Sequence, residues 1–273
     1  MSRIAATFEG LRAKGRAALV PFVTAGDPTP AHTLDVIRAL VRNGADVVEL
    51  GVPFSDPMAD GPTIQRSSER ALRAGAGLAG ILEAVGQYRR EDDRTPIVLM
   101  GYANPVERIG VAAFAARAGE AGVDGVLIVD YPPEESGPWV KVLAGAGIDP
   151  IFLISPTSSE ARIDLVASLA KGYIYYVSLK GVTGSAHIDA GDVERMLGRI
   201  RARTGIPVGV GFGIRDPQTA RAIARFADAV VVGSRIVEEI ERAGPDEAAD
   251  RAGAVLAQFR AGIDAAMGDR AAA

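Results

Sequence analysis

The stretch GADVVELG, residues 44–51, carries the pattern that predicts the fold. A small residue or glycine precedes an aspartate, and a short apolar run follows. The pattern returns in GVDGVLIVD (122–130), GIDPIFLIS (147–155) and FADAVVVGS (226–234), each time after a helix-like stretch. Since glycine commonly ends a helix in the left-handed conformation, each copy predicts a junction between a helix and a buried strand.

Further apolar runs raise the number of predicted strands to eight. These runs are continuous rather than alternating, which is typical of parallel strands buried on both faces. Helical patterns with start signals, such as Asp216-Pro217, lie between them. Eight strand–helix units favour a single (β/α)8 TIM barrel over a doubly wound sheet. The additional runs are 18–23, 96–102, 173–179 and 206–212.

Both ends of the chain are predicted to add helices to the barrel. Residues 2–14 form an amphipathic pattern that is expected to cover the barrel bottom. After the eighth strand we expect an extra short helix (235–242) and a longer one (246–265). No linker divides the chain, so residues 1–273 are interpreted as one domain with a frayed tail at 267–273.

Composition excludes several classes of function. A net charge of -4 without a basic stripe argues against nucleic acid as a partner. The chain has no cysteine, which excludes disulfides, thiolate catalysis and zinc–thiolate sites. It has neither a secretory signal pattern nor an apolar run close to the ~20 residues of a membrane span, so we expect a cytoplasmic protein.

Glu49 interrupts a predicted strand and is the main clue to function. Alternate residues of a barrel strand face the interior, so Glu49 points inward if Val48 and Leu50 pack against helices. No arginine lies in any predicted strand to pair with it. A buried carboxyl group with a raised pKa, near the C-terminal mouth of a barrel, suits general acid–base catalysis.

The loop after this strand, residues 53–63, is long for a connection between a strand and a helix. It contains two more acids, Asp56 and Asp60, and both stand in sequences that also fit ordinary turns. Sequence spacing does not decide which of the two reaches the mouth of the barrel.

Glycine-rich loops follow the seventh and eighth predicted strands, where TIM barrels often bind phosphate. Backbone N–H groups can approach an anion closely at such loops, and the start of the following short helix adds its dipole. The GVTG segment at 181–184 would complete this cradle. The loops are GVGFGIRDP (209–217) and VVGSRIVEEI (231–240).

Two other chemistries stay open on the residues alone. Lys180 ends the sixth predicted strand, where barrel aldolases place a Schiff-base lysine, although the glycine that follows favours an exposed loop. Glu49 together with Asp130 would offer two ligands to magnesium, but no third ligand is evident.

Six motifs occur in order along the chain: PFVTAGDP (21–28), ELGVPFSDPMADGPTIQ (49–65), GYANPV (101–106), GVTG (181–184), GFGI (211–214) and GSRIV (233–237). Together they make the chain resemble the tryptophan synthase alpha subunit family. The resemblance runs from about Phe8 to the end of the predicted short helix. It implies a TIM-barrel lyase of tryptophan biosynthesis that splits indole-3-glycerol phosphate into indole and glyceraldehyde 3-phosphate.

The resemblance also implies roles for single residues. Glu49 matches the general acid–base, Asp60 the carboxylate that binds the indole N–H, and Thr183 the lid residue that orients Asp60. Lys180 matches no catalytic position, and Arg235 stands where a small residue is expected. The implied substrate pocket is Phe22, Tyr102, Leu127, Tyr175 and Phe212, and the implied phosphate site is Gly184, Gly213, Gly233 and Ser234.

Finally, the resemblance implies a partner. The family's beta subunit uses pyridoxal phosphate (PLP) to join indole to serine, in a heterotetramer of two alpha and two beta chains. The alpha chain itself is expected to carry no cofactor and no metal. A stand-alone lyase that releases indole is the alternative. The implied contact surface includes Pro53, Asp56, Pro57, Asn104 and Pro132.

Overall fold

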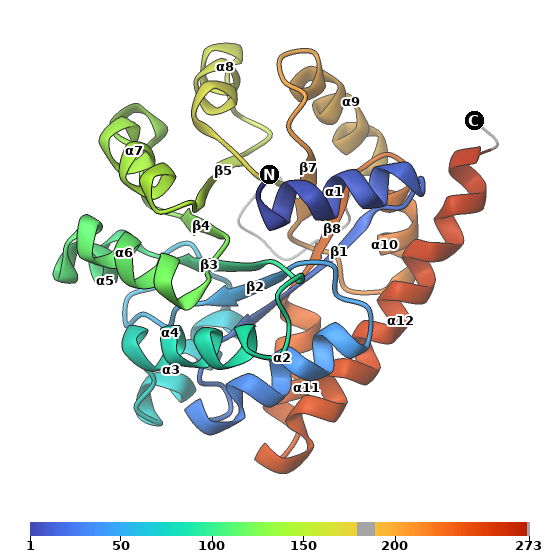
Figure 1. Cartoon of the computed structure of the whole chain (residues 1–273). Coiled ribbons are helices and arrows are strands. Elements are labelled where there is room, and N and C mark those ends of the chain that lie inside the picture. Colours follow the sequence, from blue (N-terminus) through green and yellow to red (C-terminus); the bar gives the residue numbers. More distant parts are fainter. Residues whose placement is uncertain (179–188, 272–273) are drawn as a thin grey trace.

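The computed structural model describes residues 1–178 and 189–271, with residues 268–271 as backbone only. Eight parallel strands form a closed barrel in which each strand pairs with its sequence neighbours and β8 pairs with β1 (Figure 1). The predicted TIM barrel is therefore confirmed. The strands are β1 Ala18–Thr24, β2 Val48–Gly51, β3 Ile97–Gly101, β4 Gly125–Ile128, β5 Asp149–Ile154, β6 Ile174–Val177, β7 Val208–Gly211 and β8 Ala229–Val232.

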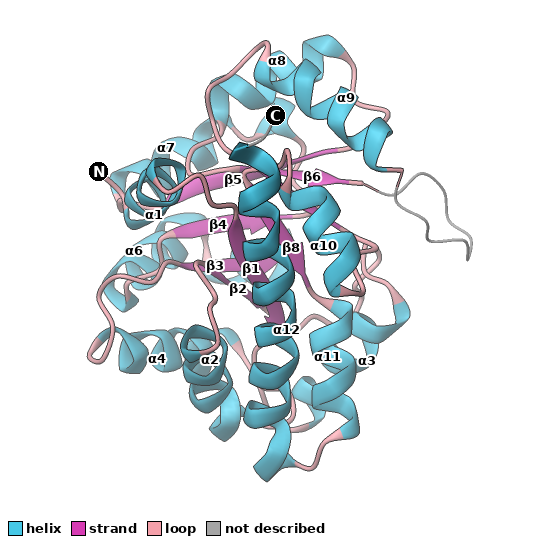
Figure 2. Cartoon of the chain, turned by 90° about the vertical axis from the view of Figure 1, so that its right-hand side faces the viewer, coloured by secondary structure: helices cyan, strands magenta, loops and turns pink. Residues whose placement is uncertain are grey.

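Helices surround this barrel (Figures 1 and 2). They are α1 Arg3–Ala13, α2 Thr33–Arg42, α3 Pro62–Arg73, α4 Leu78–Arg89, α5 Ala103–Ile109, α6 Val111–Ala121, α7 Gly137–Gly145, α8 Glu160–Leu169, α9 Ala190–Arg201, α10 Pro217–Ala224, α11 Ser234–Arg242 and α12 Pro245–Ala271, with short 3-10 helices η1 Pro30–His32 and η2 Pro133–Glu135. None of the helices within the described ranges is both long and apolar enough to cross a membrane.

The alternation of side chains along each strand divides the apolar core in two. Val48 and Leu50 of β2 pack with the helices outside the barrel, whereas Val47 packs with the cluster inside it. Glu49 is fully buried between Phe22 of β1 and Val98 of β3, its partners in strand register. The inward orientation predicted for Glu49 is therefore confirmed.

Helix α1 closes the bottom of the barrel. Its apolar side chains Ile4, Phe8 and Leu11 belong to the interior cluster, and the ring of Phe8 lies 5.8 Å from that of Tyr173. Ser2 caps the helix, since its hydroxyl accepts a hydrogen bond from the N–H of Ala5. The bottom of the barrel is therefore sealed against water from below.

The repeated aspartates have a structural role at this same end. Asp46, Asp124 and Asp228 each accept a hydrogen bond from a backbone N–H near the start of the preceding strand. Each also pairs with an arginine, which neutralises the charge. These carboxylates therefore tie neighbouring strands together on the face where barrels gain stability rather than activity. The donors are Leu19, Ile97 and Val208, at 2.8, 2.8 and 2.9 Å.

Helix α12 extends further than the sequence predicts. We expected a helix over 246–265, and the observed helix runs from Pro245 to Ala271. Ala265, Ala266 and Ala271 favour a helix, whereas Gly268 and Asp269 do not, so helix propensity alone does not explain the extension. The helix packs across α10, α2 and α11 and closes the ring between β8 and β1 (Figure 2).

Candidate active site

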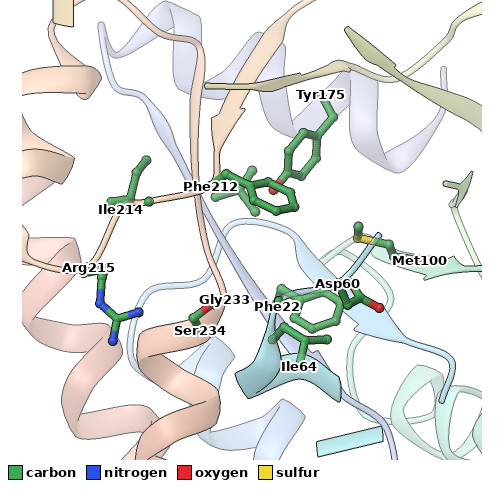
Figure 3. Close-up of a pocket in the computed structure, with 13 residues that line it drawn as sticks. Phe22, Asp60, Ile64, Met100, Tyr175, Phe212, Ile214, Arg215, Gly233 and Ser234 are labelled. Atoms are coloured by element: carbon green, nitrogen blue, oxygen red, sulfur yellow. The ribbon is translucent and has the colours of Figure 1, made fainter. Parts of the chain in front are cut away.

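A cavity of about 260 Å³ opens among residues from the carboxyl ends of the strands and the loops that follow (Figure 3). This is the end of a TIM barrel at which active sites form. Of the described residues, most that form its wall are apolar, with one acidic and one basic side chain among them. It is lined by Phe22, Asp60, Gly61, Ile64, Met100, Tyr175, Phe212, Gly213, Ile214, Arg215, Val231, Gly233 and Ser234.

Asp60 supplies the carboxylate of this cavity. The hydroxyl of Tyr102 donates to Asp60 Oδ2 at 3.0 Å, and the amide of Gln65 donates to the Asp60 carbonyl at 2.8 Å. Burial raises the pKa of Asp60 above its ordinary value, although the bond from Tyr102 opposes that rise. Of the two loop acids, Asp60 therefore faces the cavity, whereas Asp56 is exposed.

Glu49 lies one inward position deeper on β2 than Gly51 and does not line the cavity. The hydroxyl of Tyr173 donates a hydrogen bond to Glu49 Oε1, and within the described residues Oε2 has no partner. Burial raises the pKa of Glu49 to about 8, against the lowering effect of the bond from Tyr173. The carboxyl group is therefore mainly protonated at neutral pH.

Aromatic rings form the middle of the cavity, and glycines make room for two of them. A Cβ atom at Gly51 would lie 2.6 Å from Phe22 Cζ, and one at Gly211 would lie 2.0 Å from Tyr175 Oη. Tyr175 packs edge-on against Phe212, with ring centroids 6.4 Å apart. Phe212 has a φ of 70°, a left-handed conformation that bulky residues rarely adopt and that costs roughly 1–3 kcal/mol.

The opposite side of the cavity is suited to an anion. Gly213, Gly233 and Ser234 line it, and helix α11 begins at Ser234. The first N–H groups of a helix have no partner inside the helix, and the helix dipole favours negative charge there. Figure 3 places Arg215 beside Ser234, across the cavity from Asp60. The cavity thus fits a flat apolar ligand with a hydrogen-bond donor at one end and an anion at the other.

The remaining pocket predictions have mixed outcomes. Phe22, Tyr175 and Phe212 line the cavity, and Tyr102 lies next to it and holds Asp60. Leu127 is fully buried in the interior cluster and does not line the cavity. The prediction missed Gly61, Ile64, Met100, Ile214, Arg215 and Val231.

A sequence signal existed for part of that set. Met100 and Val231 lie two residues after the inward-facing Val98 and Ala229, so strand periodicity alone would have found them. Arg215 directly follows the glycine-rich GFGI motif, where a cation next to a phosphate loop is a recognisable pattern.

The predicted contact surface is only partly exposed. Asp56 and Asn104 are exposed, Pro57 and Pro132 are half-buried, and Pro53 is buried. Pro53 and Asn104 nevertheless line one groove on the surface of the chain, so the loop after β2 and helix α5 lie side by side there.

Several predictions lie outside the described residues or concern metals. Lys180, Thr183 and Gly184 fall in the segment 179–188, so their predicted roles stay predictions.

Within the described ranges no group of three His, Cys, Asp or Glu side chains could hold a metal ion. Asp130 instead accepts a hydrogen bond from the N–H of Ala103 at 2.8 Å and so fixes the start of α5.

Comparisons with known proteins agree with this geometry. The family described as "Tryptophan synthase alpha chain" matches residues 8–265. The chain is 58% identical to the tryptophan synthase alpha chain of Burkholderia pseudomallei (strain 1106a), over 97% of this chain and 98% of that one. It is 57% identical to the chain of the same name from Paraburkholderia phymatum, over 97% of each.

Solved structures agree as well. Tryptophan synthase subunit alpha from Legionella pneumophila str. Paris superposes with a TM-score of 0.90 at 41% identity, covering 97% of this chain and 99% of that one. A chain of tryptophan synthase from M. tuberculosis, in its aminoacrylate-bound form, gives 0.86 at 35% identity, covering 96% and 100%. The present chain belongs to the tryptophan synthase alpha chain family, whose members are lyases of tryptophan biosynthesis.

Proposed function

We propose that this chain cleaves indole-3-glycerol phosphate into indole and glyceraldehyde 3-phosphate by a retro-aldol reaction. The bond that breaks joins C3 of the indole ring to the glycerol chain, and its electron pair moves into the ring. C3 must therefore be protonated first, and the positive charge that develops on the ring nitrogen must be stabilised. One observation carries the proposal: Glu49, fully buried and with a raised pKa, lies below a cavity with a carboxylate at one end and an end suited to an anion opposite.

Glu49 is the general acid and base of this proposal. With a pKa of about 8 it holds a proton at neutral pH and donates it to C3 of the indole ring. Its carboxylate then takes the proton of the adjacent glycerol hydroxyl while the carbon–carbon bond breaks. The hydroxyl carbon becomes the aldehyde, the ring regains aromaticity, and Glu49 is protonated again. The carboxyl group must turn from Tyr173 towards the cavity for these steps.

Asp60 stabilises the cation in this proposal. Its carboxylate accepts a hydrogen bond from the indole N–H, and that bond strengthens as positive charge develops on the nitrogen. Tyr102 supports the role because its hydroxyl holds Asp60 Oδ2 in place. Thr183 is proposed to orient Asp60 when the loop after β6 closes.

The phosphate group is proposed to bind at the start of α11. Gly213, Gly233 and Ser234 offer backbone N–H groups at that end of the cavity. Gly184 is proposed to complete the cradle from the loop after β6. The aromatic residues between the two ends hold the indole ring, and the reaction requires no cofactor in this chain.

The proposal includes a PLP-dependent beta subunit that receives indole and joins it to serine, in an assembly of two alpha and two beta chains. The side chain of Met58, in the loop after β2, is 80% exposed, and an exposed apolar side chain of this size suits a protein interface. Pro53, which lies in the same loop as Met58, lines the groove that Asn104 also lines. Asp56, Pro57 and Pro132 are the further proposed contacts.

The test uses Glu49→Gln, which keeps the size of the side chain but removes the transferable proton. Indole release should fall by about three to four orders of magnitude, the upper range for a lost general acid–base, while substrate affinity remains. Glu83→Gln, on an exposed face of α4, is the matched control and should keep full activity. Turnover by Glu49→Gln at the wild-type rate would overturn the proposal.

Two alternatives are tested in the same assay. A Schiff base on Lys180 would be trapped by borohydride in the presence of substrate and would increase the mass of the protein. A stand-alone lyase would release indole at full rate without the beta subunit, whereas the proposed subunit is expected to gain activity when the beta subunit is added.

A further inference from the structure

An ion pair between Arg215 and Glu238 borders the proposed phosphate site. Arg215 Nη2 donates to Glu238 Oε1 at 2.6 Å, and Arg215 is the one basic side chain among the described residues that line the cavity. The Arg215 side chain is 49% exposed, whereas that of Glu238 is 15% exposed. Arg215 can therefore change its position more readily than Glu238.

Glu238 lies on the same face of α11 as Ser234. The two residues are four positions apart in the helix, and side chains at this spacing are neighbours. A carboxylate there would repel a phosphate group bound at the start of the helix unless a cation neutralised it. Arg215 provides that cation in the described structure.

The bonding of Arg215 leaves donors for a second anion. An arginine side chain carries five N–H donors in a planar fork that matches the oxygens of phosphate. Within the described residues, its only side-chain hydrogen bond is the one to Glu238. The guanidinium group is thus placed beside the anion end of the cavity with free donors and a half-exposed side chain.

A neighbouring arginine provides a contrast. Arg235 pairs with Glu239 one turn later in the same helix, and Glu239 also binds Arg242 at 3.2 Å. Arg235 does not line the cavity. Of these two arginines beside the start of α11, only Arg215 is placed to meet a ligand.

We propose that Arg215 is a phosphate-binding residue of this chain and that Glu238 is its counter-ion when no phosphate group is bound. The inference rests on the proposed function, since it assumes a phosphorylated substrate. When the ligand binds, the guanidinium group moves from Glu238 to the phosphate oxygens, or bridges the two. Removing the charge of Arg215 should then weaken binding of the phosphate group, whereas removing the charge of Glu238 should strengthen it.

The pair also touches the acidic end of the site. Thr63 Oγ1 lies 3.4 Å from Glu238 Oε1, and Thr63 follows Asp60 by three residues at the start of α3.

The experiment measures inhibition of indole release by glycerol 3-phosphate and by inorganic phosphate, using the chain with its beta subunit. Arg215→Ala should raise both inhibition constants about tenfold, the value of a hydrogen bond to a charged group at a partly exposed site. Glu238→Gln should lower them several-fold, and Arg215→Lys should recover part of the affinity. Inhibition by indole, which has no phosphate, should stay unchanged in all three variants.

Arg235→Ala is the matched control, and its inhibition constants should equal those of the wild type. If Arg215→Ala does not fold, Glu238→Gln still distinguishes the two roles of Arg215. If the ion pair were purely structural, phosphate would bind more weakly in Glu238→Gln, whereas the inference expects tighter binding. Unchanged or parallel effects of Arg215→Ala and Glu238→Gln would overturn the inference. Failure of the wild-type chain to release indole would overturn the proposed function instead.

Discussion

Replacing Glu49 by glutamine is expected to stabilise this protein, and to do so more strongly as the pH rises. The pKa of Glu49 rises from its ordinary value of 4.5 to about 8 because the group is fully buried. In the unfolded chain the carboxyl ionises near the ordinary value. Between these two values the folded state binds more protons, so the stability of the wild type falls as the pH increases.

The magnitude follows from the two pKa values. Each pKa unit corresponds to about 1.4 kcal/mol, so the buried carboxyl costs up to ~5 kcal/mol above its folded pKa. Between about pH 5 and about pH 7.5 the free energy of unfolding of Glu49→Gln should gain ~3 kcal/mol relative to the wild type. Glutamine also places N–H donors next to the Tyr173 hydroxyl, which costs free energy. That cost does not vary with pH, so it shifts the free-energy difference by a constant amount at every pH.

The assay is urea unfolding of both proteins across this pH range. The difference between the two free energies removes the contribution of every other titrating group. Asn104→Gln, at an exposed side chain that does not ionise, is the control and should give a difference that does not change with pH. A constant difference for Glu49→Gln would refute the reasoning, because it would mean that Glu49 ionises alike in the folded and unfolded chains.

Two further substitutions test how the cavity is built. Tyr102→Phe removes the hydrogen bond that lowers the pKa of Asp60, so that pKa should rise further. The kcat for indole release should then fall about tenfold, and the acid limb of the pH–rate profile should move to higher pH. Gly211→Ala would place a Cβ atom 2.0 Å from Tyr175 Oη, so urea unfolding should show a loss of about 1–3 kcal/mol, while Gly80→Ala, with nothing within 4 Å, should be neutral or stabilising.

Local sequence patterns were sufficient for the barrel and for the direction of one side chain. The continuous apolar runs and the helix-ending glycines predicted all eight strands, because burial on both faces leaves a signal within each run. The period of two placed Glu49 inside the barrel, because its neighbours Val48 and Leu50 are apolar. The same patterns did not assign the repeated aspartates, such as Asp46, whose partners lie on other strands.

The family resemblance, rather than spacing, chose Asp60 over Asp56, and the structure agrees that Asp60 faces the cavity. It also placed Leu127 in the pocket, where the structure does not. Leu127 faces inward as expected but does not line the cavity, although its register partner Met100 does. Which inward residues reach the cavity depends on how the eight strands are staggered, and no single segment reveals that.

By itself, therefore, the sequence determined the eight strands, the inward carboxylate and the glycine loops, since each leaves a periodic or turn signal within a few residues. Only the tertiary structure decided the partners that set the chemistry. Tyr173 reaches Glu49 across 124 positions, Tyr102 reaches Asp60 across 42, and Thr63 meets Glu238 across 175. Closure of the barrel brings these groups together, and burial in its interior then sets the pKa of Glu49. Neither effect can be predicted from a short segment of the sequence.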